Sequence, residues 1–321
     1  MRAWFGRLRS WAIYWWYERP GLARGILLTL GVVALLYYPL GAVLVHRIDD
    51  DLAWRPANAG EGGSIAVATA AGLIRREIDE HGWPGNDPFF KPAWILDNMP
   101  NYQLGIIESL RRFAFEMTDQ LGRARGSSAA DVDLQQASGL LQYPADVWIV
   151  AFEPYPLPKA PTESQYREAA RALERYNARL AQGTAAFDVR ADNLLSAVDR
   201  FALDLGSLSA ALDKHVTEHA GDLIDTEADD VFYRAKGQVY AYAVLLRALR
   251  QDFAAVIDQR TVANQWDEML LSLEAAASVS PWVVVNGSPS AEFRPNHLLN
   301  LGFHLLRART QMREISNILQ N

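Results

Sequence analysis

The stretch of sequence that decides the fold is GILLTLGVVALLYYPLGAVLV at residues 25–45, an uncharged run bounded by Arg24 before it and by His46 and Arg47 after it. At about 1.5 Å per residue, a helix of this length rises roughly 31 Å, enough to cross the hydrocarbon core of a membrane. The run therefore predicts a transmembrane helix at residues 25–46. The side chains expected to anchor this helix are Gly25, Leu27, Leu28, Leu30, Val32, Val33, Leu35, Leu36, Leu40, Val43, Leu44 and Val45.

A cleaved signal peptide is the alternative explanation of such a run. A signal peptide has an apolar core of about 7–15 residues, followed directly by a cleavage site with two small residues. The run here is longer, and the nearest triplet of that kind, Ala57-Asn58-Ala59, lies more than ten residues beyond Val45. We therefore expect an uncleaved anchor.

The charges on the two sides of the run predict its orientation. Residues 1–24 carry five arginines against a single glutamate, whereas Asp49, Asp50 and Asp51 closely follow the run. Because Lys and Arg near the ends of a span favour the cytoplasmic side, the N-terminus is expected in the cytoplasm and the rest of the chain across the membrane. In a bacterium with two membranes, this describes a single-pass inner-membrane protein with a periplasmic domain.

The cytoplasmic tail, residues 1–24, is rich in aromatic residues. Trp4, Leu8, Trp11 and Trp15 recur at helical spacing with arginines between them. Bulky amphipathic rings and guanidinium groups suit a helix that lies in the lipid headgroup layer. An ordinary aromatic belt next to positive-inside charge accounts for the same residues, so both interpretations stay open.

Composition excludes several classes of protein. The chain has no cysteine, which excludes a disulfide framework, a thiolate nucleophile and zinc held by cysteine. The whole chain carries a net charge of −7 and residues 1–24 carry +4, so the remainder carries −11. An acidic domain repels phosphate backbones, so nucleic-acid binding is not expected. Half of the residues are hydrophobic, enough for a packed core.

Beyond a linker at residues 47–63, the sequence predicts a helical domain at residues 64–321. Ser64 is placed to cap the first helix, and Thr162 with Gln165 has the spacing of a capping box. The clearest periodicity lies in residues 194–212 and 232–256, where apolar residues alternate steps of three and four. Further helices are expected at residues 64–81, 101–121, 162–182, 261–279 and 298–319, with a short helix after an exposed loop at residues 123–130.

Alternating steps of three and four keep one apolar stripe toward a neighbouring helix over many turns. The predicted fold class is therefore all-α, with an N-terminal transmembrane helix followed by an elongated multi-helix bundle. Two short β-like runs, at residues 147–152 and 283–285, leave room for one minor two-stranded β element in which the two runs pair. A proline cluster marks a sub-boundary near residues 153–162.

The sharpest chemical motif is His215-Val-Thr-Glu218-His219, which matches the H-x-x-E-H pattern of inverted zincins. Two histidines four apart share a helix face and are candidate ligands for one zinc ion, with Glu218 as the base. Asp213, Asp222 and Asp225 are near enough in sequence to complete such a site. The alternative is a chance pattern, with histidines that favour the C-terminal end of the helix dipole. On that alternative, no cofactor and no catalytic residue are expected.

Other candidate groups have simpler structural explanations. His297 and His304 are seven apart on one face of the last predicted helix, where histidines commonly fill a polar seam. Paired carboxylates of the kind that a glycosidase needs occur at residues 77–80 and 225–230. Acidic helix surfaces and helix N-termini produce such pairs routinely.

Three segments resemble a known family. They are DNMPNYQLG at residues 97–105, DQLGRARGSS at residues 119–128, and the ending from RPNH at residues 294–297 to LLRAR at residues 305–309. Together with the N-terminal span, they make the chain similar to the bacterial domain-of-unknown-function family numbered 2333. The resemblance covers nearly the whole chain and implies an envelope location, and it brings no catalytic residues.

Three hypotheses about function follow. The favoured one is a non-enzymatic scaffold or interaction module of the cell envelope, with the lipid bilayer and an envelope protein as partners and a homo-oligomer compatible with it. The second is a metal-dependent hydrolase built on His215, Glu218 and His219. The third is a ligand-binding sensor that acts through a separate partner, because a tail of 24 residues is too short for an output domain.

Overall fold

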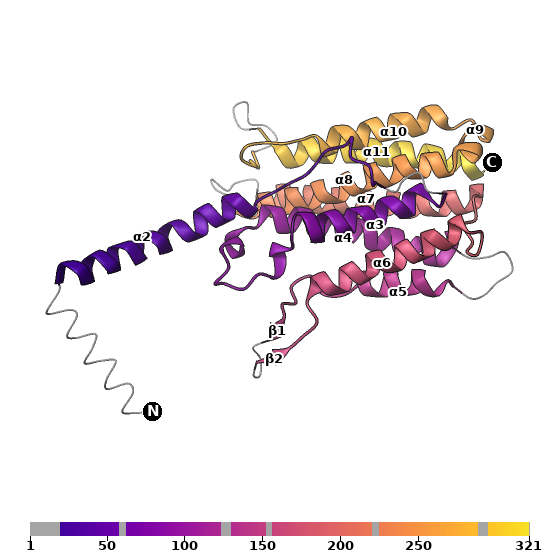
Figure 1. Ribbon diagram of the computed structural model, residues 1–321. Helices are drawn as coiled ribbons and strands as arrows, with labels where there is room; N and C mark the ends of the chain where they lie inside the picture. The colour runs from indigo at the N-terminus through magenta and orange to yellow at the C-terminus, as the bar shows by residue number, and fades with distance from the viewer. Residues whose placement is uncertain are drawn as a thin grey trace. The chain divides into compact units, whose positions relative to one another are not determined.

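The computed structural model describes residues 20–57, 62–122, 130–151, 156–219, 225–287 and 295–320 (Figure 1). Within these ranges the chain is all-α apart from one very short β hairpin, which confirms the predicted fold class. The four tail residues Trp4, Leu8, Trp11 and Trp15 lie outside the described residues. The chain forms two compact units. One contains the N-terminal helix and Pro88–Leu96, and the other contains Arg47–Asp87 and residues 97–320.

The first unit is built on α2, Pro20–Val45, which covers the predicted transmembrane helix as far as Val45. An apolar stretch at Arg24–Val45 has the length and composition needed to cross a membrane, a property that membrane anchors and signal sequences share. Pro39 lies inside the helix without ending it. The loop Pro88–Leu96, with the short 3₁₀ turn η3 at Pro92–Ile95, packs on the C-terminal half of α2.

The second unit is a helical bundle. Its helices are α3 (Ile65–Arg75), α4 (Asn98–Glu116), α5 (Val132–Leu141), α6 (Thr162–Ala181), α7 (Ala191–Glu218), α8 (Ala228–Asp252), α9 (Ala254–Gln259), α10 (Ala263–Ala277) and α11 (His297–Gln320). Short π-helical turns, η1 at Arg76–Glu80 and η4 at Met117–Leu121, continue α3 and α4, and a 3₁₀ turn, η2, occupies Pro84–Asn86. The predicted helices are therefore present, with bounds that differ by a few residues.

Helix α8 lies at the centre of the bundle. It packs against α3, α4 and α10, while α11 packs against α7 and α10, and α5 packs against α6 (Figure 1). Aromatic residues such as Phe232, Tyr240 and Tyr242 on α8 are fully buried. Side chains from both sides of the proline cluster, among them Leu141 and Tyr166, are buried in the same hydrophobic core.

Two glycines set the distance between α4 and α8. A Cβ atom on Gly105 would lie 2.1 Å from the carbonyl oxygen of Arg234, and one on Gly237 would lie 2.0 Å from the carbonyl oxygen of Tyr102. Both obstacles are backbone atoms, which a side-chain rotation cannot remove. The two helices can therefore approach this closely only because both positions lack a side chain.

The helix caps agree with the sequence at one end and not at another. The Ser64 hydroxyl accepts a hydrogen bond from the N–H of Val67, as predicted. The carboxylate of Asp252 accepts the N–H groups of the first two helical residues, Ile65 and Ala66, at 2.8 and 2.9 Å. The capping box at Thr162 was wrong. Pro161 occupies the N-cap position, and the Thr162 hydroxyl lies 2.8 Å from the carbonyl oxygen of Pro144, to which it donates.

In the residues that the structure describes, which exclude Phe152, the two β-like runs do not pair with each other. Val150–Ala151 (β1) pairs antiparallel with Leu157–Pro158 (β2), and Asn286 forms an isolated bridge with Asn296. The run at residues 283–285 forms no strand, and the bridge lies one residue beyond it. Both pairings join residues no more than ten positions apart, where closing the loop costs less conformational entropy than a pairing over more than a hundred residues.

Candidate functional site

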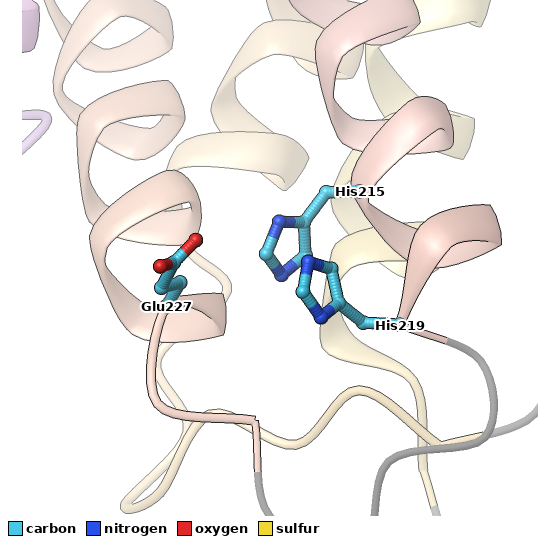
Figure 2. A group of neighbouring side chains, drawn as sticks. All are labelled: His215, His219 and Glu227. Carbon is cyan, nitrogen blue, oxygen red and sulfur yellow. The ribbon is translucent and has the colours of Figure 1, made fainter.

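The two histidines of the H-x-x-E-H motif lie at the end of α7, facing the start of α8 (Figure 2). Their imidazole rings are stacked, with centroids 4.4 Å apart and an angle of 25° between the planes. Glu227, which precedes α8, approaches both rings, so that ligand atoms of His215, His219 and Glu227 all lie within 4.8 Å of one another. The structure therefore brings together the two predicted histidines and one carboxylate that sequence analysis did not assign to them.

Glu218 is not part of this cluster. Its side chain is 56% exposed, and its carboxylate lies 3.8 Å from the ammonium group of Lys214, one turn earlier on the helix. Successive residues of an α-helix are rotated by about 100°, so a residue next to His219 points away from the shared face of the histidines. Glu227, and not Glu218, is thus the glutamate that lies beside the two histidines.

A second carboxylate, Asp225, holds His215 in place. Its Oδ2 lies 2.9 Å from Nε2 of His215 and accepts a hydrogen bond from the amide of Asn286 at 2.8 Å. Burial raises the pKa of Asp225, but the hydrogen bonds from Asn286 and His215 outweigh that effect and keep the pKa below its ordinary value. The ionised carboxylate fixes the orientation of the His215 ring. Asp213 is exposed on α7, and Asp222 lies outside the described residues.

The other predicted histidines serve the fold. Nδ1 of His297 accepts the N–H of Val285 at 2.9 Å, and burial lowers its pKa, as expected for a neutral imidazole. The ring of His304 meets that of Phe303 edge to face, with centroids 5.4 Å apart. Within the described residues, neither histidine belongs to the cluster of Figure 2.

Two imidazoles and nearby carboxylates form a donor set that suits zinc and related divalent cations. The stacked rings direct their nitrogen lone pairs in similar directions, whereas the donors of one ion must converge on it. Binding of an ion would therefore require a small rotation of the side chains. Glu218, the base of the motif, lies outside the cluster, and the donor set that the structure brings together is His215, His219 and Glu227.

A different buried polar network lies where α3 passes into η1. Nε of Arg76 donates to the Glu77 carboxylate at 2.9 Å, and both side chains are about 1% exposed. His81 lies 3.3 Å from the other Glu77 oxygen, to which the amide of Gln103 also donates at 3.1 Å. The Arg76 guanidinium stacks over Trp54 and Tyr240, with centroid distances of 5.1 and 5.0 Å. A fully buried ion pair of this kind is costly unless such partners surround it.

The network fastens residues 49–52, which follow α2 in the chain. The Tyr102 hydroxyl donates to the carbonyl of Asp49 at 2.9 Å, and the Tyr240 hydroxyl donates to that of Asp51 at 3.0 Å. Burial raises the pKa of Tyr240 to about 12, so its hydroxyl remains a donor at any physiological pH. The buried ammonium group of Lys236 lies 2.6 Å from the Asp50 carboxylate. The residues that directly follow the apolar helix are thus held by α4 and α8.

A groove with a volume of about 830 Å³ runs between α4, α7 and α8. Two ion pairs cross it. Arg112 on α4 binds both oxygens of Asp204 on α7, at 2.9 and 3.1 Å, and Arg234 on α8 binds both oxygens of Glu108. The buried Tyr242 hydroxyl also donates to Asp204, at 2.7 Å. The side chain of Phe115, 46% exposed, lies at the rim.

Comparison with protein families gives a match over most of the chain. Residues 54–321 match the family described as "Uncharacterized protein conserved in bacteria (DUF2333)". The chain belongs to this family. The matched range contains the three segments on which the predicted resemblance rests and begins after α2. A search of the curated proteins and a search of the solved structures both give no match.

Two features of this DUF2333 chain escaped sequence analysis. Glu227 follows a segment of the chain whose course the sequence did not predict, so no spacing rule could join it to the histidines. The second feature is the buried ion pair of Arg76 and Glu77, and the sequence does indicate that Glu77 is buried. Steps of three and four from Ala70 through Leu73 or Ile74 lead to Glu77, which places it on the apolar stripe of the helix. A charged residue on the buried stripe of a helix predicts a paired or functional group.

Proposed function

We propose that this chain is a single-pass protein of the bacterial inner membrane, with its N-terminus in the cytoplasm and its helical domain in the periplasm. The observation that carries the anchor is the exposure of α2. Among its described side chains only Ala42 is buried, whereas Leu28 and Leu44 are 70% and 84% exposed. A helix that is apolar on all sides suits lipid rather than water. The arginines of residues 1–24 support the orientation.

We propose further that the helical domain works as a non-enzymatic interaction module or scaffold, with the groove between α4, α7 and α8 as its binding surface. The groove's two acids, Asp204 and Glu108, are both committed to arginines, so neither is free to act as a general base. With Arg111, three arginines stand against two carboxylates in the lining. A protein segment of net negative charge fits this balance.

Site-specific photo-crosslinking in living cells tests this proposal. With a photo-reactive residue in place of Phe115, at the groove, we expect one defined adduct with an exported envelope protein. The same residue in place of Leu271, which is 64% exposed on α10, is the matched control and should give no such adduct. Equal adducts at both positions would contradict the groove as the binding surface, and capture of a cytoplasmic protein would contradict the orientation.

The cluster of Figure 2 favours a second candidate function, a divalent cation site that joins the end of α7 to the start of α8. Its ligands would be His215, His219 and Glu227, with Asp225 orienting the first histidine. This candidate departs from the hydrolase hypothesis, because Glu218 takes no part. Such an ion would stabilise the junction of the two helices, since it binds only the folded arrangement.

Metal analysis of the purified full-length protein distinguishes a cation site at His215, His219 and Glu227 from one that uses Glu218. If the site binds zinc, we expect about one ion per chain after zinc loading and dialysis. His219→Ala and Glu227→Ala should lose the ion, whereas Glu218→Ala and the control His304→Ala should retain it. Loss of zinc in Glu218→Ala would instead support the motif's original assignment, and a wild-type protein without zinc would reject the site.

A further inference from the structure

The loop Pro88–Leu96 in the first unit exposes an unusual concentration of large apolar side chains. Phe89, Phe90, Trp94 and Ile95 are 66%, 46%, 56% and 47% exposed. The same nine residues contain one lysine, Lys91, and no acid. Aromatic and aliphatic side chains with a basic residue are the composition of segments that lie at a membrane surface.

This loop is attached to one face of α2. The hydroxyl of Tyr37 donates to the carbonyl of Phe90 at 3.0 Å, and the hydroxyl of Tyr38 donates to that of Phe89 at 2.7 Å. Gly41 continues the same face, three and four residues on. A Cβ atom there would lie 2.2 Å from Cβ of Pro92, so the absence of a side chain allows Pro92 to pack against the helix. The loop therefore lies at the level of Tyr37 and Tyr38 along the helix.

Part of the loop's backbone is hydrogen-bonded within the first unit. Pro88 and Pro92 have no N–H group, and the N–H groups of Lys91, Trp94 and Leu96 donate within the loop, at 2.8, 3.2 and 2.9 Å. Together with the two tyrosine hydroxyls, these bonds satisfy the carbonyls of residues 88–91 and 93. Satisfied backbone groups are the main requirement for non-helical chain at the edge of a bilayer.

We propose that Pro88–Leu96 is a second membrane-inserting element, which lies at the boundary between headgroups and acyl chains on the outer side of the bilayer that α2 crosses. This inference rests on the proposed anchor. Helix α2 has 26 residues and rises roughly 38 Å, so it is longer than a hydrocarbon core of about 30 Å. A helix centred on that core places Tyr37 and Tyr38 roughly 7 Å inside the outer boundary, a depth to which the apolar face of an interfacial segment is buried. Tyrosines are enriched near such boundaries. The loop on these tyrosines therefore lies among lipids, and its lysine suits anionic headgroups.

The absence of cysteine from the chain makes a direct test simple. Full-length protein with a single substitution, Trp94→Cys, Leu30→Cys or Leu271→Cys, is labelled with an environment-sensitive fluorophore and reconstituted in phosphatidylethanolamine and phosphatidylglycerol vesicles. Leu30 on α2 is 59% exposed and tests the anchor, and Leu271 on α10 is 64% exposed and is the aqueous control. Quenchers attached at a shallow or a deep position of the lipid chain, and aqueous iodide, then report the depth of each label.

We expect blue-shifted emission at positions 94 and 30, with position 94 quenched several-fold more by the shallow lipid than by the deep one, and position 30 the reverse. Position 271 should respond to iodide alone. If position 94 behaves like position 271 while position 30 is quenched by lipid, the loop proposal is overturned and the anchor stands. If position 30 also responds to iodide alone, the anchor fails. If neither the lipid quenchers nor iodide reach position 94, the loop is covered by protein rather than by lipid, and the proposal is overturned.

Discussion

Replacement of Glu77 by glutamine is expected to lower the free energy of unfolding by about 3–5 kcal/mol, because it leaves the buried Arg76 guanidinium without its main countercharge. A loss of this size is a large part of the stability of an ordinary domain. Denaturant titration of the full-length protein in detergent measures it. Glu174→Gln is the matched control, since it removes the partner of the adjacent Arg75 in a pair whose side chains are 30% and 45% exposed. That change should cost less than about 1 kcal/mol.

The ion pair of Arg76 and Glu77 also predicts that the free energy of unfolding depends on pH. Burial alone raises the pKa of Glu77, but the hydrogen bond from His81 and the charge of Arg76 outweigh it, so the pKa lies below the ordinary value of 4.5. A carboxyl group whose pKa is depressed by folding stabilises the protein above its unfolded pKa and loses that contribution as pH falls through the folded pKa. The difference in the free energy of unfolding between the wild type and Glu77→Gln should therefore become smaller below about pH 4.5. A gap that is constant down to pH 3 would show that the loss has another cause.

Gly237→Ala is expected to destabilise the bundle by about 3 kcal/mol or more, although alanine is the better helix former. The new methyl group would lie 2.0 Å from the Tyr102 carbonyl oxygen, so α4 and α8 would have to separate. Thermal unfolding followed by circular dichroism measures the change. Gly302→Ala, at a helical glycine in α11 with no atom within 4 Å of the new methyl group, should instead raise stability by about 0.5–1 kcal/mol. Two substitutions with effects of the same sign would contradict the close approach.

Helices were the most predictable part of this protein. The steps of three and four in residues 194–212 and 232–256 predicted α7 and α8, because a stripe of that period can be buried only by a helix. The capping box at Thr162 was wrong because a threonine hydroxyl has several acceptors within reach, and tertiary contacts placed the Pro144 carbonyl closer. Of the two β-like runs, only that at residues 147–152 contains a strand, Val150–Ala151, and its partner depended on loop closure, which local composition does not reveal.

The candidate sites were less predictable for a related reason. Spacing on one helix placed His215 and His219 on a common face, yet the third group came from another element, Glu227. The groove depends on side chains from three helices, and its ion pairs, such as Arg112 with Asp204, join residues 92 positions apart. Only the packing of α4, α7 and α8 brings these groups together, and helix periodicity leaves the neighbours of each helix undetermined.

The fastening of residues 49–52 has a consequence for biosynthesis. A chain is made from its N-terminus, so this segment is synthesised early, yet the tyrosine that binds Asp51 is 189 positions away and the arginine that binds the carbonyl of Leu52 is 195 positions away. At roughly 5–20 residues per second, the ribosome needs on the order of 10–40 s to deliver them. During that interval Arg76 and Glu77 also lack the shelter of α8. The first part of the domain to be synthesised must therefore wait, unfolded, for one of the later helices to complete it.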